Sequence, residues 1–208
     1  MEIPGGSQLA TFPLAFPTKS VAREKLQINF RQAAMESPHT FAFQAVNTAA
    51  QWTLDITWPR MSHAQAQVVQ GWVNSLKGQV GTFRYSPRSA VNTALTGRSL
   101  ASAAYGYAET IRMTGWAANS TSGLSVGQFF SLGDQLLQIT AAPAAADANG
   151  QVLVEFQPML RRTFTTGTAV NFATPSGVFR LASAESPSFD LDVDRRPTFP
   201  SLLAKEAI

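Results

Sequence analysis

Three aspartates near the C-terminus, Asp190, Asp192 and Asp194, are the only clustered carboxylates in the chain. They alternate with apolar residues, which predicts a strand over 188–194 with all three carboxylates on one face. Neighbouring side chains on one face of a strand lie about 7 Å apart, whereas a calcium site needs oxygens that converge on one point at about 2.3–2.6 Å. The spacing therefore predicts no metal site. It leaves two interpretations: a solvated strand face, or an acidic lining or partner surface.

The two histidines, His39 and His63, have no second histidine or carboxylate at a metal-binding or catalytic spacing. A structural or surface role is therefore the expected one for both. The chain has no cysteine, which excludes disulfides, thiolate nucleophiles and cysteine-based metal sites. It also lacks a Gly-x-Ser-x-Gly elbow, a Walker loop and a dinucleotide fingerprint. We expect no catalytic residue, no cofactor and no metal.

Tryptophan is the remaining residue type that often forms a binding site, because its ring stacks on sugars. Trp52, Trp58 and Trp72, three of the four tryptophans, fall on the apolar side of periodic segments. Buried aromatic rings of this kind contribute large contact areas to a core. The pattern favours three core anchors over a sugar-binding platform.

The composition favours a subunit that packs against other subunits. The chain has 208 residues, of which 45% are hydrophobic and only 14% are charged, and its net charge is +3. A freely diffusing monomer usually carries more charge for solubility. No Lys/Arg cluster resembles a nucleic-acid-binding face. No run approaches the roughly 18 apolar residues of a membrane helix, and the N-terminus lacks the basic region of a secretory signal.

One segment predicts a strand, a helix and a second strand in succession. Apolar and polar residues alternate over 52–58, which indicates a half-buried strand. Ser62 and Gln65 have the spacing of a capping box, so a helix over 62–77 is expected. The residues expected on its buried face are Val68, Val69, Trp72, Val73 and Leu76. Nothing on this helix suggests chemistry, and its expected role is to pack against a sheet.

The rest of the chain is rich in short strands. Strands are expected at 25–30 and 41–46, with a turn at 47–50, and a linker at 89–104. Beyond it, short strands recur roughly every 8–12 residues, which is typical of a small barrel or sandwich. We therefore predict a mainly β (α+β) fold. An antiparallel β domain with the one packed helix is formed by 1–92 with 183–208, and 93–182 is an inserted β-barrel or sandwich.

The order of several motifs resembles a family of tail proteins from tailed phages and prophages. The similar segments are WTLDITWPRM at 52–61, WVNSLKGQVGTF at 72–83, GQFFSLGDQLLQI at 127–139, PMLRR at 158–162 and GVFRL at 177–181. The resemblance covers about residues 25–182. Each motif alone has little specificity, and their order along the chain carries the similarity. The chain is thus similar to siphophage distal tail proteins and their relatives in the baseplate.

This resemblance implies a virion structural protein at the tail tip, assembled in the host cytoplasm, with no enzymatic activity. It implies a ring, usually a hexamer, that joins the tail tube to the tail-tip hub or baseplate. The expected partners are further copies of the chain, the tail tube protein and the hub proteins. DNA is expected only in passage through the lumen, and no membrane contact is expected. In that setting Asp190, Asp192 and Asp194 become candidates for a channel-facing acidic strand.

Two further expectations accompany this interpretation. The irregular N-terminal arm, residues 1–20, is expected to strap a neighbouring subunit through Phe12, Leu14 and Phe16. The alternative function is a receptor- or carbohydrate-binding tail module that uses the peripheral barrel as a lectin-like face. An enzyme is the least favoured class, because no acid/base or nucleophile group is visible.

Overall fold

The computed structural model describes residues 11–17, 21–89, 95–191 and 197–207. Its residues are 42% strand and 7% helical, with one helix and a closed six-stranded barrel, so the mainly β prediction is confirmed. The chain forms two compact units. Unit 1 comprises Met1–Lys25, Asp55–Tyr85 and Val178–Ala207; unit 2 comprises Leu26–Leu54 and Ser86–Gly177. The predicted division into one domain of 1–92 with 183–208 and another of 93–182 stays a prediction.

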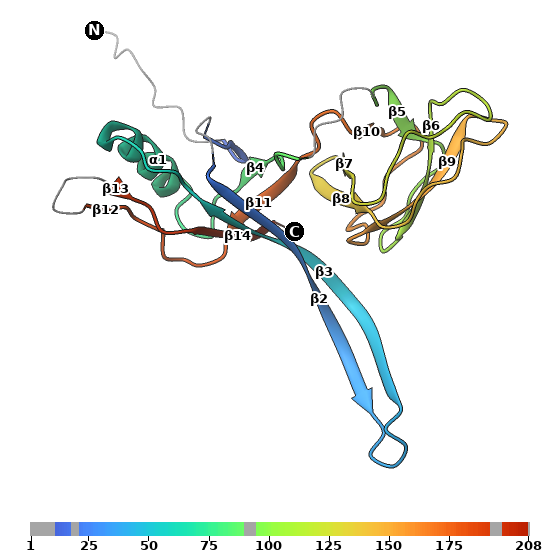
Figure 1. Cartoon of the computed structure of the whole chain (residues 1–208), viewed down its shortest axis with the longest axis horizontal. Helices are drawn as coiled ribbons and strands as arrows, with labels where there is room; N and C mark the ends of the chain where they lie inside the picture. The colour runs from blue at the N-terminus through green and yellow to red at the C-terminus, as the bar shows by residue number, and fades with distance from the viewer. Residues whose placement is uncertain (1–10, 18–20, 90–94, 192–196, 208) are drawn as a thin grey trace, which may run out of the picture. The chain divides into compact units, whose positions relative to one another are not determined.

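The larger open sheet of the chain has six strands (Figure 1). Its strands, in spatial order, are β1 (Leu14–Ala15), β4 (Phe83–Tyr85), β11 (Gly177–Leu181), β14 (Leu202–Glu206), β3 (Phe43–Thr57) and β2 (Arg23–Glu36). β1 runs parallel to β4, and β11 runs antiparallel to β14. β11, which the sequence analysis grouped with 93–182, thus belongs to this sheet. So does β14.

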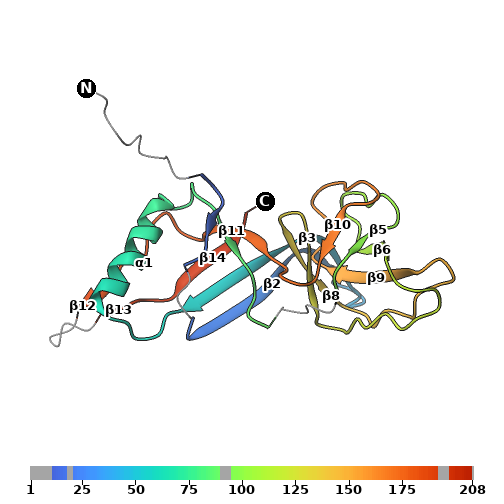
Figure 2. The same cartoon turned by 90° about the horizontal axis from the view of Figure 1, so that it is seen from above.

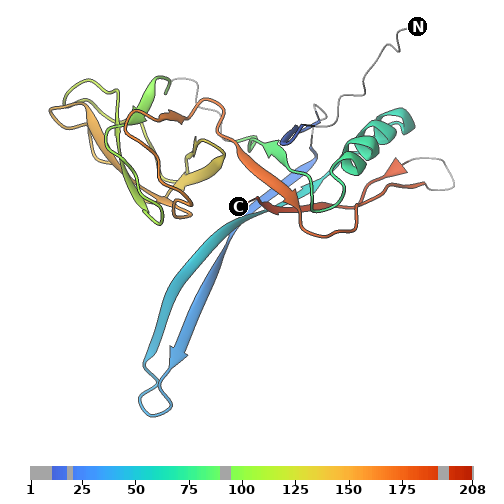
Figure 3. The ribbon, with the colours of Figure 1, turned by 180° about the vertical axis from the view of Figure 1, so that it is seen from behind.

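β2 and β3 form one hairpin of 14 and 15 residues, closed by the loop at 37–42 (Figures 1 and 3). The predicted turn at 47–50 is wrong, because that segment lies inside β3. The Thr48 hydroxyl donates to the Arg31 carbonyl at 2.8 Å, and the Thr53 hydroxyl donates to the Gln27 carbonyl at 3.2 Å. Pairing with β2 therefore overrides the weak strand propensity of the sequence Asn-Thr-Ala-Ala.

Helix α1 (His63–Ser75) begins as predicted. The Ser62 hydroxyl accepts a hydrogen bond from the Gln65 backbone N–H, and the Gln65 side chain accepts one from the Ser62 N–H. The buried residues are Ala66, Val69, Val73 and Leu76. Val68, expected on this face, is 66% exposed. The buried set recurs every three or four residues, and Val68 lies about 100° of helix rotation before Val69.

An aromatic cluster joins the helix to the sheet inside unit 1. The Phe16 ring stacks on Trp58 with centroids 5.4 Å apart and meets Trp72 and Tyr85 edge-on at 5.4 and 4.9 Å. Phe83 is fully buried and lies 5.2 Å from the Trp72 ring. Phe16 therefore anchors the N-terminal segment to its own chain, and the contact of residues 1–20 with a neighbouring subunit stays a prediction.

Unit 2 contains the barrel (Figure 2). Its strands close in the order β10 (Ala169–Asn171), β5 (Arg98–Leu100), β6 (Thr110–Thr114), β9 (Gln151–Gln157), β8 (Gln135–Ile139) and β7 (Phe129–Leu132). Phe130 is fully buried in its core, and its ring centroid lies 5.6 and 5.5 Å from those of Phe156 and Phe172. β5 lies inside the segment that was predicted to be a linker. The sequence did not predict this strand, because Arg-Ser-Leu is too short to show a period. The small pair β12 (Asp190–Leu191) and β13 (Pro197–Thr198) completes the strands, in unit 1.

We predict that Phe83→Ala lowers the free energy of unfolding by about 3–5 kcal/mol, because it empties a buried aromatic site. Urea denaturation followed by circular dichroism measures the loss. Val68→Ala is the control on the exposed face of α1, with an expected change within about 0.5 kcal/mol. A loss below about 1 kcal/mol for Phe83→Ala contradicts the assignment of the cluster as the core of unit 1.

Candidate functional site

The distal half of the β2–β3 hairpin carries an unusual number of exposed apolar side chains. Their exposed fractions range from 48% to 76%, and they come from both strands and from the loop between them. We call the β2–β3 hairpin the arm, which is distinct from the N-terminal residues 1–20. We call this set of residues the arm surface: Phe30, Met35, Phe41, Phe43 and Val46. Exposed apolar side chains gathered on one element make it a candidate interaction site.

The arm surface is also almost uncharged. Arg31 and Glu36 are the only Asp, Glu, Lys or Arg residues between Leu26 and Leu54. β2 is the last strand in the order of the six-stranded sheet, so its outer edge has no neighbouring strand among the described residues. An open strand edge is a template for pairing with another chain, and charges on the strand oppose such pairing. The arm therefore combines an apolar surface with an open edge.

The loop at 37–42 is held in one shape by backbone and hydroxyl hydrogen bonds. The Ser37 N–H donates to the Ala42 carbonyl and the Phe41 N–H donates to the Ser37 carbonyl, both at 2.9 Å. The Thr40 N–H adds a bond to the Ser37 hydroxyl at 3.3 Å. Phe41 has a φ of +54° and is 76% exposed. A bulky residue at positive φ is an outlier, so the loop holds this ring outward at a conformational cost.

The other end of the arm is fixed within unit 2. The Trp52 indole N–H donates to the Leu136 carbonyl at 2.8 Å, and its ring lies 5.7 Å from that of Phe129. The Arg161 guanidinium donates to the Ala50 carbonyl. Trp52 is 2% exposed and Ala50 is 1% exposed. These contacts tie the proximal part of β3 to β8 and to the segment that follows β9.

The predicted acidic strand is described only in part. Asp190 lies in β12 and is exposed, whereas Asp192 and Asp194 lie outside the described residues. Among the described residues, no group of three or more histidine, aspartate or glutamate side chains has the arrangement of a metal site. The proposed role of this strand in a channel stays a prediction.

The tryptophans lie mostly in the protein interior, whereas both histidines are exposed. Trp58, like Trp52, is buried, at 6% exposed, and Trp72 is half-buried with its indole N–H donating to the Ala15 carbonyl at 2.9 Å. His63 is exposed at the start of α1 and packs edge-on against Phe189 at 5.7 Å. His39 is exposed in the loop at the tip of the arm. No two of these side chains share a catalytic arrangement in the described part of the chain.

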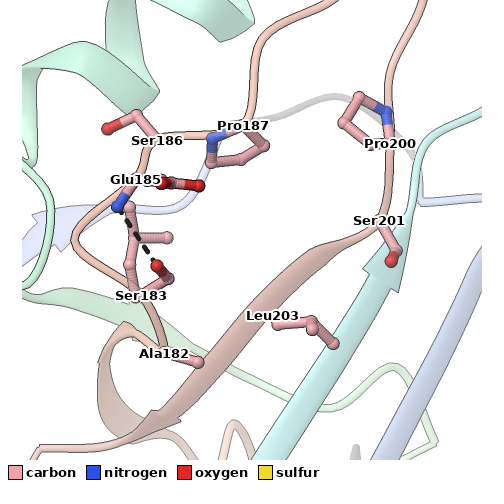
Figure 4. A pocket seen from close by; sticks show the side chains of 9 residues that line it. Ala182, Ser183, Glu185, Ser186, Pro187, Pro200, Ser201 and Leu203 are labelled. Atoms are coloured by element: carbon pink, nitrogen blue, oxygen red, sulfur yellow. Dashed lines mark hydrogen bonds between the residues drawn. The ribbon is translucent and has the colours of Figure 1, made fainter.

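Unit 1 contains a surface pocket of about 330 Å³ (Figure 4). It lies between the segment at 181–187 and the segment at 200–203. Pro187 and Pro200 flank it, and Leu203, which is 55% exposed, lies at its base. Glu185 is its one ionisable lining residue, and its backbone N–H donates to the Ser183 hydroxyl at 3.2 Å. The pocket is mostly apolar and open.

No protein-family model matches the sequence, and no curated protein matches it. No helix in the described ranges is long and apolar enough to cross a membrane.

Sequence reasoning missed the arm surface. The residues Phe41 and Phe43 alternate with alanine, and this pattern is the usual mark of a half-buried strand. The signal that distinguishes the arm is the length over which the pattern runs without charge, combined with Pro38 at its midpoint. A two-stranded ribbon has no second layer to cover it, so apolar side chains that alternate along its strands stay exposed.

We predict that Trp52→Phe costs about 1–3 kcal/mol of unfolding free energy, because it leaves the Leu136 carbonyl without its donor in a buried place. Thermal and urea unfolding report the loss. Tyr105→Phe removes a polar atom from a side chain that is 70% exposed, and its expected effect is within about 0.5 kcal/mol. Equal effects of the two changes contradict a structural role for the indole hydrogen bond.

Proposed function

We propose that the chain is a structural subunit of a long-tailed phage, forming a six-membered ring that joins the tail tube to the tail-tip hub or baseplate. The observation that carries the proposal is the arm: a long hairpin that has only two charged residues between Leu26 and Leu54 and exposes five large apolar side chains. The order of motifs along 25–182, similar to that of distal tail proteins, supplies the identity of the assembly.

The physical argument begins with the stability of the arm. A two-stranded hairpin is marginally stable in water without a further layer or strand. The arm also exposes Phe43 and Met35 at 67% and 76%. Burial of apolar area stabilises by about 25 cal/mol per Å², so contact with another subunit stabilises both the assembly and the arm. A surface of this kind suits a protein that functions in the assembled state.

The difference between the two edges of the sheet supports a ring. β2 ends the six-stranded sheet with 14 residues, and β1 ends it with two. Identical subunits that join through unlike surfaces make head-to-tail contacts, which close into rings when the rotation allows. The tail tube of the phages that this chain resembles has six subunits per ring, and a connector seated on it matches that number.

One observation favours the alternative of receptor or carbohydrate binding. Tyr105 and Tyr107 in unit 2 are 70% and 81% exposed, and Tyr107 has a φ of +68°. The Tyr107 N–H donates to the Leu160 carbonyl at 2.7 Å, which fixes the loop. Exposed tyrosines on a rigid loop suit the stacking of a sugar ring. This function is compatible with a ring, because it uses the barrel and leaves the arm free.

We predict that Phe43→Asp abolishes ring formation while both units stay folded, because it places a charge in the arm surface. Light scattering at increasing protein concentration and electron microscopy give the number of copies. Leu153→Asp is the matched control, since Leu153 is 55% exposed on barrel strand β9. A wild-type protein that stays monomeric at all concentrations and is absent from the tail axis refutes the ring, whereas glycan binding lost in Tyr107→Ala favours the alternative.

We also predict that replacing Asp190, Asp192 and Asp194 together by lysine slows or blocks DNA ejection from assembled particles. Clustered lysines in a channel bind phosphates in a salt-dependent way. Ejection kinetics measured at low and high salt test this, with the triple Asp→Asn variant as the control for loss of charge alone. Intact particles that eject DNA at the normal rate contradict a channel-facing position.

A further inference from the structure

The tip of the arm has the form of a knob. Its six residues, 37–42, contain one large apolar side chain, Phe41, and one ionisable side chain, His39. Both are exposed, and the hydrogen bonds of Ser37 keep the loop in one conformation. Because the Phe41 backbone is already held in its strained conformation, a partner that binds the phenyl ring loses little free energy in ordering the loop.

The pocket of unit 1 has the form of a matching socket, defined by 181–187 and 200–203 (Figure 4). Its volume of about 330 Å³ lies at the small end of the roughly 300–1,000 Å³ typical of ligand sites, which suits one aromatic side chain and its flanking backbone. Leu203 and the two prolines supply apolar contacts, and Glu185 is the one ionisable group.

We propose that the tip of one copy seats in the socket of the next copy, with the Phe41 ring in the pocket and His39 beside Glu185. The occupant is a second copy because both halves of the contact are present in the chain and their chemistry matches. The apolar ring meets apolar walls, and an imidazole N–H donates to a carboxylate. This inference rests on the proposed ring, for which it names the contact between subunits.

The contact is head-to-tail, because the tip and the socket are different surfaces. A knob on one surface and a pocket elsewhere on the same chain join copies in one direction, and repeated contacts give a closed ring or an open filament. A buried aromatic anchor in a pocket is also the usual location of the largest part of the binding energy in an interface. The other residues of the arm surface then contribute shape complementarity and exclude water from the surroundings of Phe41.

The absence of cysteine from the chain allows a direct test by disulfide trapping. Phe41→Cys and Leu203→Cys are made as separate single variants, one with a mass tag, and are mixed and oxidised at a concentration where the protein self-associates. A disulfide forms only where the Cα atoms come within about 4.4–6.8 Å. The expected product is a tagged–untagged heterodimer, which two copies alone can form. Leu153→Cys replaces Leu203→Cys in the matched control, because both leucines are 55% exposed.

The outcomes separate this inference from the ring itself. A six-membered ring in electron micrographs with no excess of the Phe41–Leu203 product over the control overturns the tip-and-socket contact and leaves the ring intact. The specific product in a protein that forms filaments or dimers supports the contact and overturns the ring. The product together with a ring supports both.

A substitution series gives an independent readout. Phe41→Ala is expected to weaken self-association by about tenfold or more, as for an anchor residue. Tyr107→Ala is the control, because it also removes an exposed aromatic side chain from a backbone at positive φ. Sedimentation measures both. Equal association of the Phe41→Ala variant and the wild type overturns the role of the Phe41 side chain as the anchor.

Discussion

Alternation along β3 is the constraint on which the rest of the structure depends. Ala50, Trp52, Leu54, Ile56 and Trp58 are all buried, and the residues between them are half-buried. β3 supplies Trp52 to the contacts of unit 2, and Trp58, the residue that follows β3, belongs to the aromatic cluster of unit 1. A shift of one residue in the pairing of a strand moves its whole apolar set to the other face. The register of β3 therefore determines the packing of both units at once.

The same strand loses its buried face toward the loop. From Phe43 to Val46 every residue is exposed, although apolar residues continue. The change in environment comes from the number of layers, since the proximal part of β3 packs against other elements and the distal part has only β2. The arm is thus a continuation of a core strand without the core, and this is why its surface resembles an interior.

Much of the fold could be predicted from the sequence because its signals are local. The Ser62–Gln65 capping box, the Gly-Asp turn between β7 and β8, and the alternation of β9 each specify their element without help from distant residues. The parts of the fold that the sequence did not predict depend on contacts with residues distant in the chain. Residues 47–50 are strand because β2 lies beside them, and Phe16 is core because Trp58 and Trp72 meet it there.

The candidate site was harder to predict than the fold for the same reason. Its members are ordinary apolar residues, and only their exposure makes them notable. His39, expected to have a structural or surface role, and Asp190, a candidate for the channel-facing strand, are both exposed. The site of a protein that works by assembly is a property of which surfaces the fold leaves uncovered.

A long apolar ribbon also exposes a chain to unwanted pairing before it reaches its partner. Three features of the arm oppose this. Arg31 and Glu36 place charges on the edge strand β2, and Pro38 at the tip cannot donate a ladder hydrogen bond. Charges and prolines beside apolar strands commonly prevent aggregation. The arm therefore exposes its apolar side chains for the contact that we propose at Phe41, while the charges on its edge strand oppose unwanted pairing.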